Sequence, residues 1–174
     1  MKAKYVPAIL VVVLLTAGSA WAQKVNVDYD HSADFTKYKT YAWMESRNPA
    51  PSDLSHRRIV EAIDQQLAAK GLRKVDRNPD LLVVYNAGVK EQVSVQGYSY
   101  GYYPYRWGGG GSVYLYENVE LQATLIVDLV DAQKQELAWR GVATDTISDK
   151  PEKNIKKINK AAEKMFKKFP PPGR

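Results

Sequence analysis

The chain has 174 residues, no cysteine, two histidines and a formal net charge of +6 at neutral pH. The absence of cysteine excludes disulfides, thiol nucleophiles, thiolate metal sites and a lipid attached to a cysteine. The length corresponds to one domain, and so mild a basic excess favours solubility over binding of nucleic acid.

The N-terminal segment has the pattern of a secretory signal peptide. Its first four residues include Lys2 and Lys4, and an apolar run follows over residues 8–17, which is shorter than the ~20 residues that a spanning helix needs. Small residues at Ala20 and Ala22 suit a cleavage site. We therefore expect residues 1–22 to be removed, and residues 23–174 to form one exported, soluble domain without a lipid anchor, periplasmic or associated with the outer membrane. An uncleaved signal anchor is the alternative.

Two short strands are predicted ahead of the first helix. Residues 24–30 alternate apolar and polar side chains, as in a half-buried strand, and residues 40–44 are rich in aromatic side chains. We expect these strands to form a hairpin. Its core and edge aromatic residues would be Phe35, Tyr38, Tyr41 and Trp43.

A helix follows, with clear signals at both ends. Ser52 or Asp53 can cap its first amides, and Gly71 can adopt the left-handed conformation that ends many helices. Its apolar residues recur every four positions: Ile59, Ile63 and Leu67.

The second half of the chain predicts three strands and a terminal helix. The strands are expected at 81–85, 119–129 and 137–146, with a long loop between the first two. Asp149 and Glu152 have the spacing of a capping box at the start of the helix. The apolar stripe of this helix comprises Ile155, Ile158, Ala162, Met165, Phe166 and Phe169.

The order of elements is strand, strand, helix, strand, long loop, strand, strand, helix. Hairpin strands with two helices separated in the sequence predict an α+β fold. We expect a mostly antiparallel sheet with both helices packed on one face, which is a two-layer sandwich.

Seven short segments, in order, carry a resemblance to a known family: 27–30, 34–43, 67–72, 78–81, 125–131, 139–141 and 169–171. Together they resemble the family called domain of unknown function 4136, which comprises bacterial exported and lipid-anchored proteins. The resemblance implies a single envelope domain with the α+β layout, and it supplies no catalytic residue. The lack of cysteine sets this chain apart from the lipid-anchored members.

Several of these residues also have a structural interpretation. Asp80 and Asp131 lie at predicted turns, where carboxylates accept local amide hydrogen bonds. Trp139 would pack its ring beside a close approach at Gly141.

The segment 97–116 is the main candidate for binding, because tyrosine combines a large rigid face with one hydroxyl group and glycine lets a loop adapt. The candidate contact residues are Tyr98, Tyr100, Tyr102, Tyr103, Tyr105, Trp107, Tyr114 and Tyr116. A low-complexity hairpin tip without a ligand is the alternative. The four glycines at 108–111 do not form a phosphate loop, because no Gly-Lys-Ser/Thr follows.

The terminal helix carries a second candidate surface, for contact with anionic lipid or wall polymer. Its candidate residues are Lys156, Lys157, Lys160 and Lys164. A solvated outer face is the alternative. A third cluster, Asp28, Asp30 and His31, hints at a metal or acid–base site, but further ligands are not apparent and a turn explains it. We expect no catalytic residue, cofactor or metal.

These observations favour a non-catalytic envelope module that binds another envelope protein or a polysaccharide through the Tyr/Gly-rich segment. The alternative is a structural or stress-related protein that associates electrostatically with membrane or cell wall through the terminal helix. A hydrolase without a recognisable motif is the third possibility. The sequence gives no indication of the oligomeric state.

Overall fold

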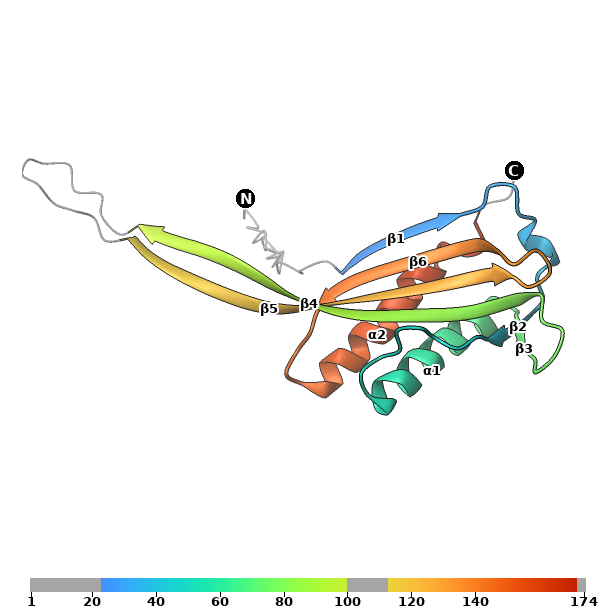
Figure 1. The fold of residues 1–174 in the computed structure, drawn as a ribbon, viewed down its shortest axis with the longest axis horizontal. Coiled ribbons are helices and arrows are strands. Elements are labelled where there is room, and N and C mark those ends of the chain that lie inside the picture. Colours follow the sequence, from blue (N-terminus) through green and yellow to red (C-terminus); the bar gives the residue numbers. More distant parts are fainter. Residues whose placement is uncertain (1–22, 100–112, 172–174) are drawn as a thin grey trace, which may run out of the picture.

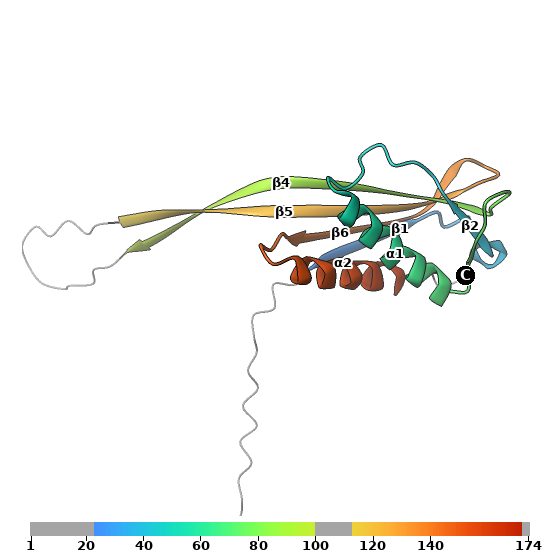
Figure 2. The ribbon, with the colours of Figure 1, turned by 90° about the horizontal axis from the view of Figure 1, so that it is seen from below.

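A six-stranded sheet forms one layer of the protein, and two helices cover one of its faces (Figures 1 and 2). The computed structural model describes residues 23–99 and 113–171. The elements are β1 (Lys24–Tyr29), the 3-10 turn η1 (Phe35–Lys37), β2 (Thr40–Trp43), α1 (Asp53–Ala69), β3 (Arg73–Lys74), β4 (Leu81–Ser99), β5 (Val113–Asp131), β6 (Glu136–Thr146) and α2 (Pro151–Phe166).

The strands lie in the order β1-β6-β5-β4-β2-β3. The pairs β1–β6, β6–β5 and β5–β4 are antiparallel, whereas β4–β2 and β2–β3 are parallel. The predicted α+β class and mostly antiparallel sheet are thereby confirmed. The predicted hairpin of β1 and β2 is wrong, because β1 lies at one edge beside β6 and β2 lies on the other side of β4. Alternation specifies which face of a strand is buried, but it does not specify the partner strand.

The strands β4 and β5 are far longer than the predicted ones. They pair continuously from Leu81 opposite Asp131 to Ser99 opposite Val113. Both ends of the segment 97–116 are therefore strand, and residues 100–112 lie outside the described residues. Most strands in globular proteins have about 5 or 6 residues, so a pair of 19-residue strands extends well beyond the body (Figure 1).

The hydrophobic core lies between the sheet and the helices. The predicted stripe of α1 is buried, and Met165 and Phe166 of α2 are fully buried beside it. The sheet contributes Leu81, Val83, Tyr85, Val127, Leu129 and Trp139 to the same cluster. The two-layer arrangement follows, because each helix has one apolar stripe and the sheet has one strongly apolar face.

The ends of α1 agree with the sequence, whereas the start of α2 does not. Ser52 caps α1 and accepts a hydrogen bond from the Ser55 amide, and Gly71 has a φ of +84°. The capping box expected before α2 is absent, since Lys150 holds the N-cap position without a side-chain bond. The side-chain amide of Asn154 reaches back instead, accepting from the Ser148 amide at 2.9 Å and donating to its carbonyl at 2.7 Å.

Asp80 fastens β2 to the start of β4. Its carboxylate accepts hydrogen bonds from the amides of Lys39 and Thr40, both at 2.9 Å, and from the Thr40 hydroxyl at 2.8 Å. The bond from the Lys39 amide is the main reason that the pKa of Asp80 is lowered. The sequence predicts that Asp80 accepts hydrogen bonds from nearby amides. It instead accepts them from residues 39 and 40, which are about forty positions away along the chain and could not be identified from the sequence.

Gly141 lies beneath the ring of Trp139, as the sequence predicts. A Cβ atom at this position would lie 2.6 Å from Cη2 of Trp139 and 2.8 Å from Sδ of Met165. We expect Gly141→Ala to lower the free energy of unfolding by about 2 kcal/mol, because overpacking a filled core forces side chains out of place. Urea unfolding followed by circular dichroism measures this loss.

The matched control for that substitution is Gly88→Ala. A Cβ atom at position 88 meets no atom within 4 Å, and glycine inside a strand is itself unfavourable. This variant should be at least as stable as the wild type. Equal losses in the two variants would contradict the close approach at Gly141.

Candidate functional site

The outer parts of β4 and β5, residues 88–99 and 113–121, form a two-stranded ribbon beyond the body (Figure 1). On one side, β6 pairs with β5 only up to Gln122, and the amide of Ile147 adds one bond to Leu121. On the other side, the last backbone bond to β4 joins the Ala87 amide to Asn48. Within the described part of the chain, no strand pairs with the outer edges of the ribbon.

The ribbon has one apolar face, and this face continues the helix-covered face of the sheet. The register places Val89 opposite Ala123, Val93 opposite Val119, and Leu121 opposite Glu91. Residues directly opposite in an antiparallel pair point to the same side. Val89, Val93, Val119 and Leu121 are 48%, 55%, 58% and 44% exposed. The helices therefore end before this apolar face does (Figure 2).

The opposite face of the ribbon is polar. It carries Lys90, Gln92 and Ser94 from β4 and Asn118 and Glu120 from β5. The ribbon is thus amphipathic, as is a pair of strands that packs against another element on one face and is solvated on the other. Exposed apolar surface with a polar surround is typical of an interaction site.

A groove of about 190 Å³ lies at the base of the ribbon. Its floor is the helix-facing side of β4, β5 and β6, and its walls are the N-terminal halves of α1 and α2. The lining is largely apolar and includes Ile59, Ala87, Ala123, Leu125, Ala143 and Ile158. The groove lies at the junction of body and ribbon. Its lining includes Ala87 and Val89 of β4 and Leu125 and Ala123 of β5, which are the positions where the ribbon leaves the body.

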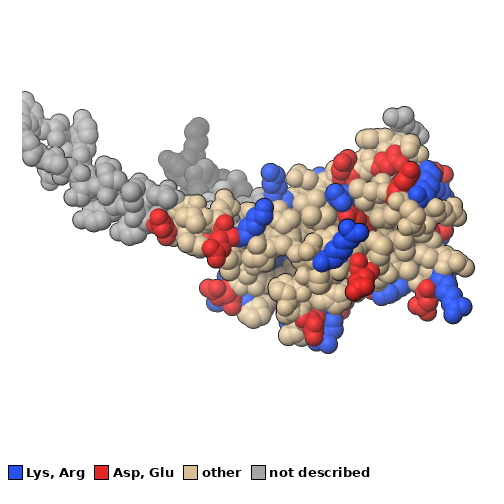
Figure 3. All heavy atoms as spheres, in the orientation of Figure 1, with Lys and Arg blue, Asp and Glu red and all other residues tan. Residues whose placement is uncertain are grey.

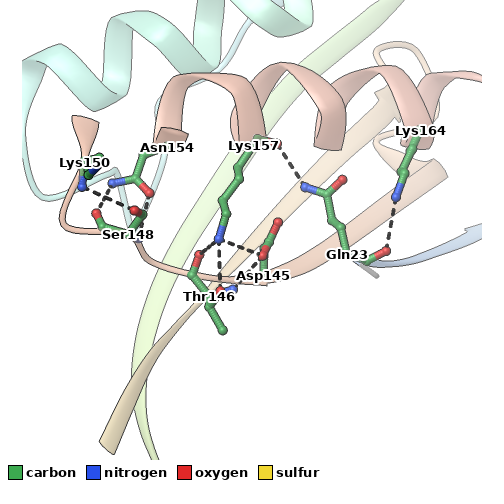
Figure 4. A network of polar contacts seen from close by, with 8 residues as sticks. All are labelled: Gln23, Asp145, Thr146, Ser148, Lys150, Asn154, Lys157 and Lys164. Carbon is green, nitrogen blue, oxygen red and sulfur yellow. Dashed lines mark hydrogen bonds and ion pairs between the residues drawn. The ribbon is translucent and has the colours of Figure 1, made fainter. Parts of the chain in front are cut away.

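Polar residues form the rim of the groove beside α2 (Figure 4). The Lys157 ammonium donates to the carbonyl and hydroxyl oxygens of Thr146 at 2.6 and 2.9 Å, and pairs with Asp145 at 3.1 Å. Gln23 Nε2 donates to the Lys157 carbonyl at 2.9 Å, and the Lys164 ammonium lies 3.5 Å from the Gln23 carbonyl. These bonds tie both the start of the first strand and the end of the last one to α2.

The four candidate lysines of α2 do not form one exposed set. Lys156 and Lys160 are exposed, whereas Lys157 and Lys164 are half-buried and make the bonds just described. Basic and acidic side chains are interspersed over the face seen in Figure 3. Binding of an anionic surface by these lysines stays a prediction, with only two of the four fully presented to solvent.

The tyrosine candidates divide into two groups. Tyr98 lies in β4 opposite Tyr114 of β5, and Tyr116 lies opposite Gln96. The other candidates, Tyr100, Tyr102, Tyr103, Tyr105 and Trp107, lie outside the described residues. The backbone register thus places three of the eight candidates on the ribbon.

The third cluster is held by local contacts: Asp28 accepts a hydrogen bond from the Tyr29 amide, and the ring centroids of His31 and Tyr29 lie 4.4 Å apart. The Asp30 carboxylate accepts bonds from the amide and hydroxyl of Ser32, both at 2.7 Å, which lower its pKa and form the predicted turn. His56 Nδ1 lies 2.6 Å from the Tyr85 hydroxyl, and this hydroxyl accepts a hydrogen bond from the Ala50 amide. This contact joins the segment before α1 to the sheet, and no sequence pattern signals it.

The family model described as "Domain of unknown function (DUF4136)" matches residues 25–171. The chain belongs to this family. The expected family is thereby confirmed over nearly all of the described residues. A comparison with curated proteins finds no match.

Solved structures of other proteins are similar to this chain at low sequence identity. A PDZ domain protein from Parabacteroides distasonis has a TM-score of 0.57 and 14% identity, and the match covers 86% of this chain but only 36% of that protein. The PelC dodecamer from Paraburkholderia phytofirmans has a TM-score of 0.45 and 14% identity, over 80% of this chain and 95% of that one. A minor lipoprotein from Acinetobacter baumannii has a TM-score of 0.40 and 13% identity, over 76% and 92%.

The match to the PDZ domain protein shows a common fold and nothing about function. Neither helix in the described residues combines the length and the apolar character that crossing a membrane requires.

Proposed function

We propose that this protein is a non-catalytic interaction module, exported to the cell envelope, that binds a partner protein through the β4–β5 ribbon. One observation carries the proposal. The ribbon projects beyond the helices, no helix or strand among the described residues packs on its apolar face, and four aliphatic side chains on that face are about half exposed. The signal-like N-terminal segment supports export, and the family and fold are compatible with this role without specifying it.

A ribbon of this kind gains stability from a partner. An isolated pair of strands is marginally stable in water, since it buries little apolar surface. Its outer edges also present backbone amide and carbonyl groups that another strand can pair with. A partner can therefore cover the apolar face of the ribbon or pair with one of its edges while the sheet and helices of the body keep their structure.

The charges of the ribbon indicate the chemistry of that partner. Among its residues 88–94 and 117–121, Glu91, Glu117 and Glu120 are acidic and only Lys90 is basic. Glu91 and Glu117 share the apolar face. A complementary surface therefore combines aliphatic or aromatic side chains with lysine or arginine. The tyrosines of the segment 97–116 would add contacts of the kind that protein interfaces favour.

The substitution Val93→Lys tests the proposal. It replaces an exposed apolar side chain by a cation on the proposed contact face, so it removes a contact and repels a basic partner. We expect the yield of partner captured by crosslinking in cells, identified by mass spectrometry, to fall about tenfold, which corresponds to the loss of one strong interface contact.

Gln92→Lys is the matched control. Gln92 is the exposed neighbour on the polar face, opposite Glu120. Gln92→Lys adds the same charge on the polar face and leaves the apolar face unchanged. The yield of crosslinked partner should therefore equal that of the wild type. Exposed substitutions change stability little, and both variants should melt like the wild type. Equal capture by the two variants would refute the proposed contact face.

A further inference from the structure

The strand β1 presents an open edge on the body of the domain. It ends the sheet on one side, whereas the other side ends in β3, which has only two residues (Figure 1). Proteins usually protect an edge strand by shortening it, by a proline or by a bulge. The six residues of β1 include no proline, and their register with β6 runs without a shift. This edge is therefore able to pair with a further strand.

The hydrogen bonds to β6 identify the backbone groups that this edge presents. The Asp30 amide donates to the carbonyl of Ala138 across the β1–β6 pair. Bonded and non-bonded positions alternate in an antiparallel pair, so the even-numbered residues of β1 bond to β6. Val25 and Val27 therefore direct their amide and carbonyl groups outward, and no backbone group in the described part of the chain bonds to them there. Their side chains pack against the core on the helix-facing side.

Lysines of α2 border this edge (Figure 4). Gln23, directly before β1, donates from its side chain to the Lys157 carbonyl, and its own carbonyl lies 3.5 Å from the Lys164 ammonium. Lys168 is exposed and follows one turn after Lys164, so helical spacing places it on the same side. Lys157 is paired with Asp145, whereas neither Lys164 nor Lys168 forms an ion pair with a described residue. The edge thus has uncompensated positive charge beside it.

These lysines determine which strand can pair with β1. A strand added beside β1 would have alternate side chains on the helix-facing side, next to Lys164 and Lys168. Carboxylates at those positions gain ion pairs, whereas basic side chains are repelled. A second copy of this chain does not fit, because antiparallel pairing of two β1 strands would place both α2 helices on the same face of the sheet. Their lysine sides would then face each other.

We propose that the outer edge of β1 binds an acidic, extended segment of a partner protein as an additional strand. The backbone of this segment bonds to Val25 and Val27, as in other complexes formed by strand addition. Its carboxylates on the helix-facing side pair with Lys164 and Lys168. The site goes beyond the contact proposed for the ribbon and uses none of its residues, so either proposal stands if the other fails.

Fluorescence anisotropy with synthetic peptides and the purified protein tests the charge of the partner. The probe is a fluorescein-labelled peptide in which threonine and glutamate alternate, and the control peptide has lysine in place of each glutamate. We expect saturable binding of the acidic peptide, which weakens as salt is added, and at least about tenfold weaker binding of the basic one. Absence of binding by the acidic peptide, or equal binding of the two, would overturn the proposal.

N-methylated peptides test whether the backbone takes part. One version of the acidic peptide is methylated on the amides of its glutamates and the other on the amides of its threonines, so both keep every charge. Only alternate amides of a strand face its neighbour. One version should therefore lose at least about tenfold in affinity through its missing donors, while the other binds like the unmodified peptide. Equal affinities of the two versions would indicate a purely ionic contact and refute strand addition.

Charge reversal on α2 locates the site. Lys168→Glu should weaken binding of the acidic peptide by about tenfold. Lys156→Glu is the matched control, because Lys156 is also exposed but helical spacing places it about 120° away around the helix. It should change the affinity by less than about twofold at physiological salt. Circular dichroism verifies that both variants fold, and equal losses in the two would refute the site.

The ribbon variant Val93→Lys separates this proposal from the previous one. It leaves β1 and α2 unchanged, so the acidic peptide should bind to it as to the wild type. A loss of peptide binding in this variant would place the peptide on the ribbon and overturn the site at β1.

Discussion

Replacing Trp139 by alanine is expected to lower the free energy of unfolding by about 4 kcal/mol. The ring is fully buried, and its centroid lies 5.1 Å from that of Phe166 and 5.6 Å from that of Phe169. It joins β6 to α2 and to the segment after it, so its removal leaves a cavity at the centre of the sandwich. Urea unfolding with circular dichroism measures the loss.

Trp139→Phe separates ring packing from hydrogen bonding. The indole Nε1 is buried and has no acceptor among the described residues, so phenylalanine forfeits no hydrogen bond there. We expect a loss well below that of alanine, of about 1 to 2 kcal/mol for the smaller ring. A loss under about 1 kcal/mol for Trp139→Ala would contradict the packing described for this residue.

Replacing Asp131 by alanine is expected to cost about 3 kcal/mol at neutral pH. This carboxylate is 2% exposed and accepts four hydrogen bonds. Two come from the local amides of Gln133 and Lys134, as the sequence predicts, and two come from the Tyr38 hydroxyl at 2.9 Å and the Lys37 ammonium at 3.0 Å. Removing the acceptor leaves the buried Tyr38 hydroxyl without a partner. Asp30→Ala, in an exposed turn, should have a much smaller effect.

The stabilisation by Asp131 depends on pH in a defined direction. Burial opposes the ionised form, but the hydrogen bonds from the Lys134 amide, Lys37, Tyr38 and the Gln133 amide outweigh it and hold the pKa of Asp131 well below its usual range. A lowered pKa in the folded state stabilises the fold above the unfolded-state pKa of about 4 and progressively less below it. The stability difference between wild type and Asp131→Ala should therefore be largest near neutral pH and narrow as the pH falls below about 4. A difference that grows on acidification would contradict this account.

The helices were predictable because their signals are local. Ser52, Gly71 and the stripe from Ile59 to Leu67 lie within one stretch of chain, and the structure confirms each. The start of α2 was not predictable in detail. Asp149 has the right spacing for a capping box, but the side chain of Asn154 already binds the backbone of Ser148 ahead of the helix.

Strand pairing was less predictable, because it depends on residues far apart in sequence. The alternation in residues 24–30 identifies a half-buried strand, yet its partner β6 lies more than one hundred residues away along the chain. Asp80 likewise fixes the parallel pairing of β2 and β4 by bonds across forty residues. Patterns of hydrophobicity contain no information on such contacts.

The sequence pointed to a segment next to the candidate site and did not identify the apolar face itself. The sequence drew attention to residues 97–116 for their tyrosine and glycine content, whereas the structure draws attention to the strands leading to them. The sequence analysis placed Val93 in the long loop between two predicted strands, and the alternation from residue 119 onward assigned Val119 to a half-buried strand. Only the positions of the helix ends show that neither α1 nor α2 covers this face (Figure 2). The groove likewise depends on where the helices end relative to the sheet, which the sequence pattern does not specify.

The proposed contact between the apolar face of the ribbon and a partner protein can be tested by photocrosslinking. A photoreactive benzoylphenylalanine residue is placed at position 93, and in a second variant at position 92, because these two side chains lie on opposite faces of one strand. On irradiation of living cells, we expect a discrete crosslinked product from position 93 and a much weaker one from position 92. Equal products from both positions, or none from position 93, would contradict it.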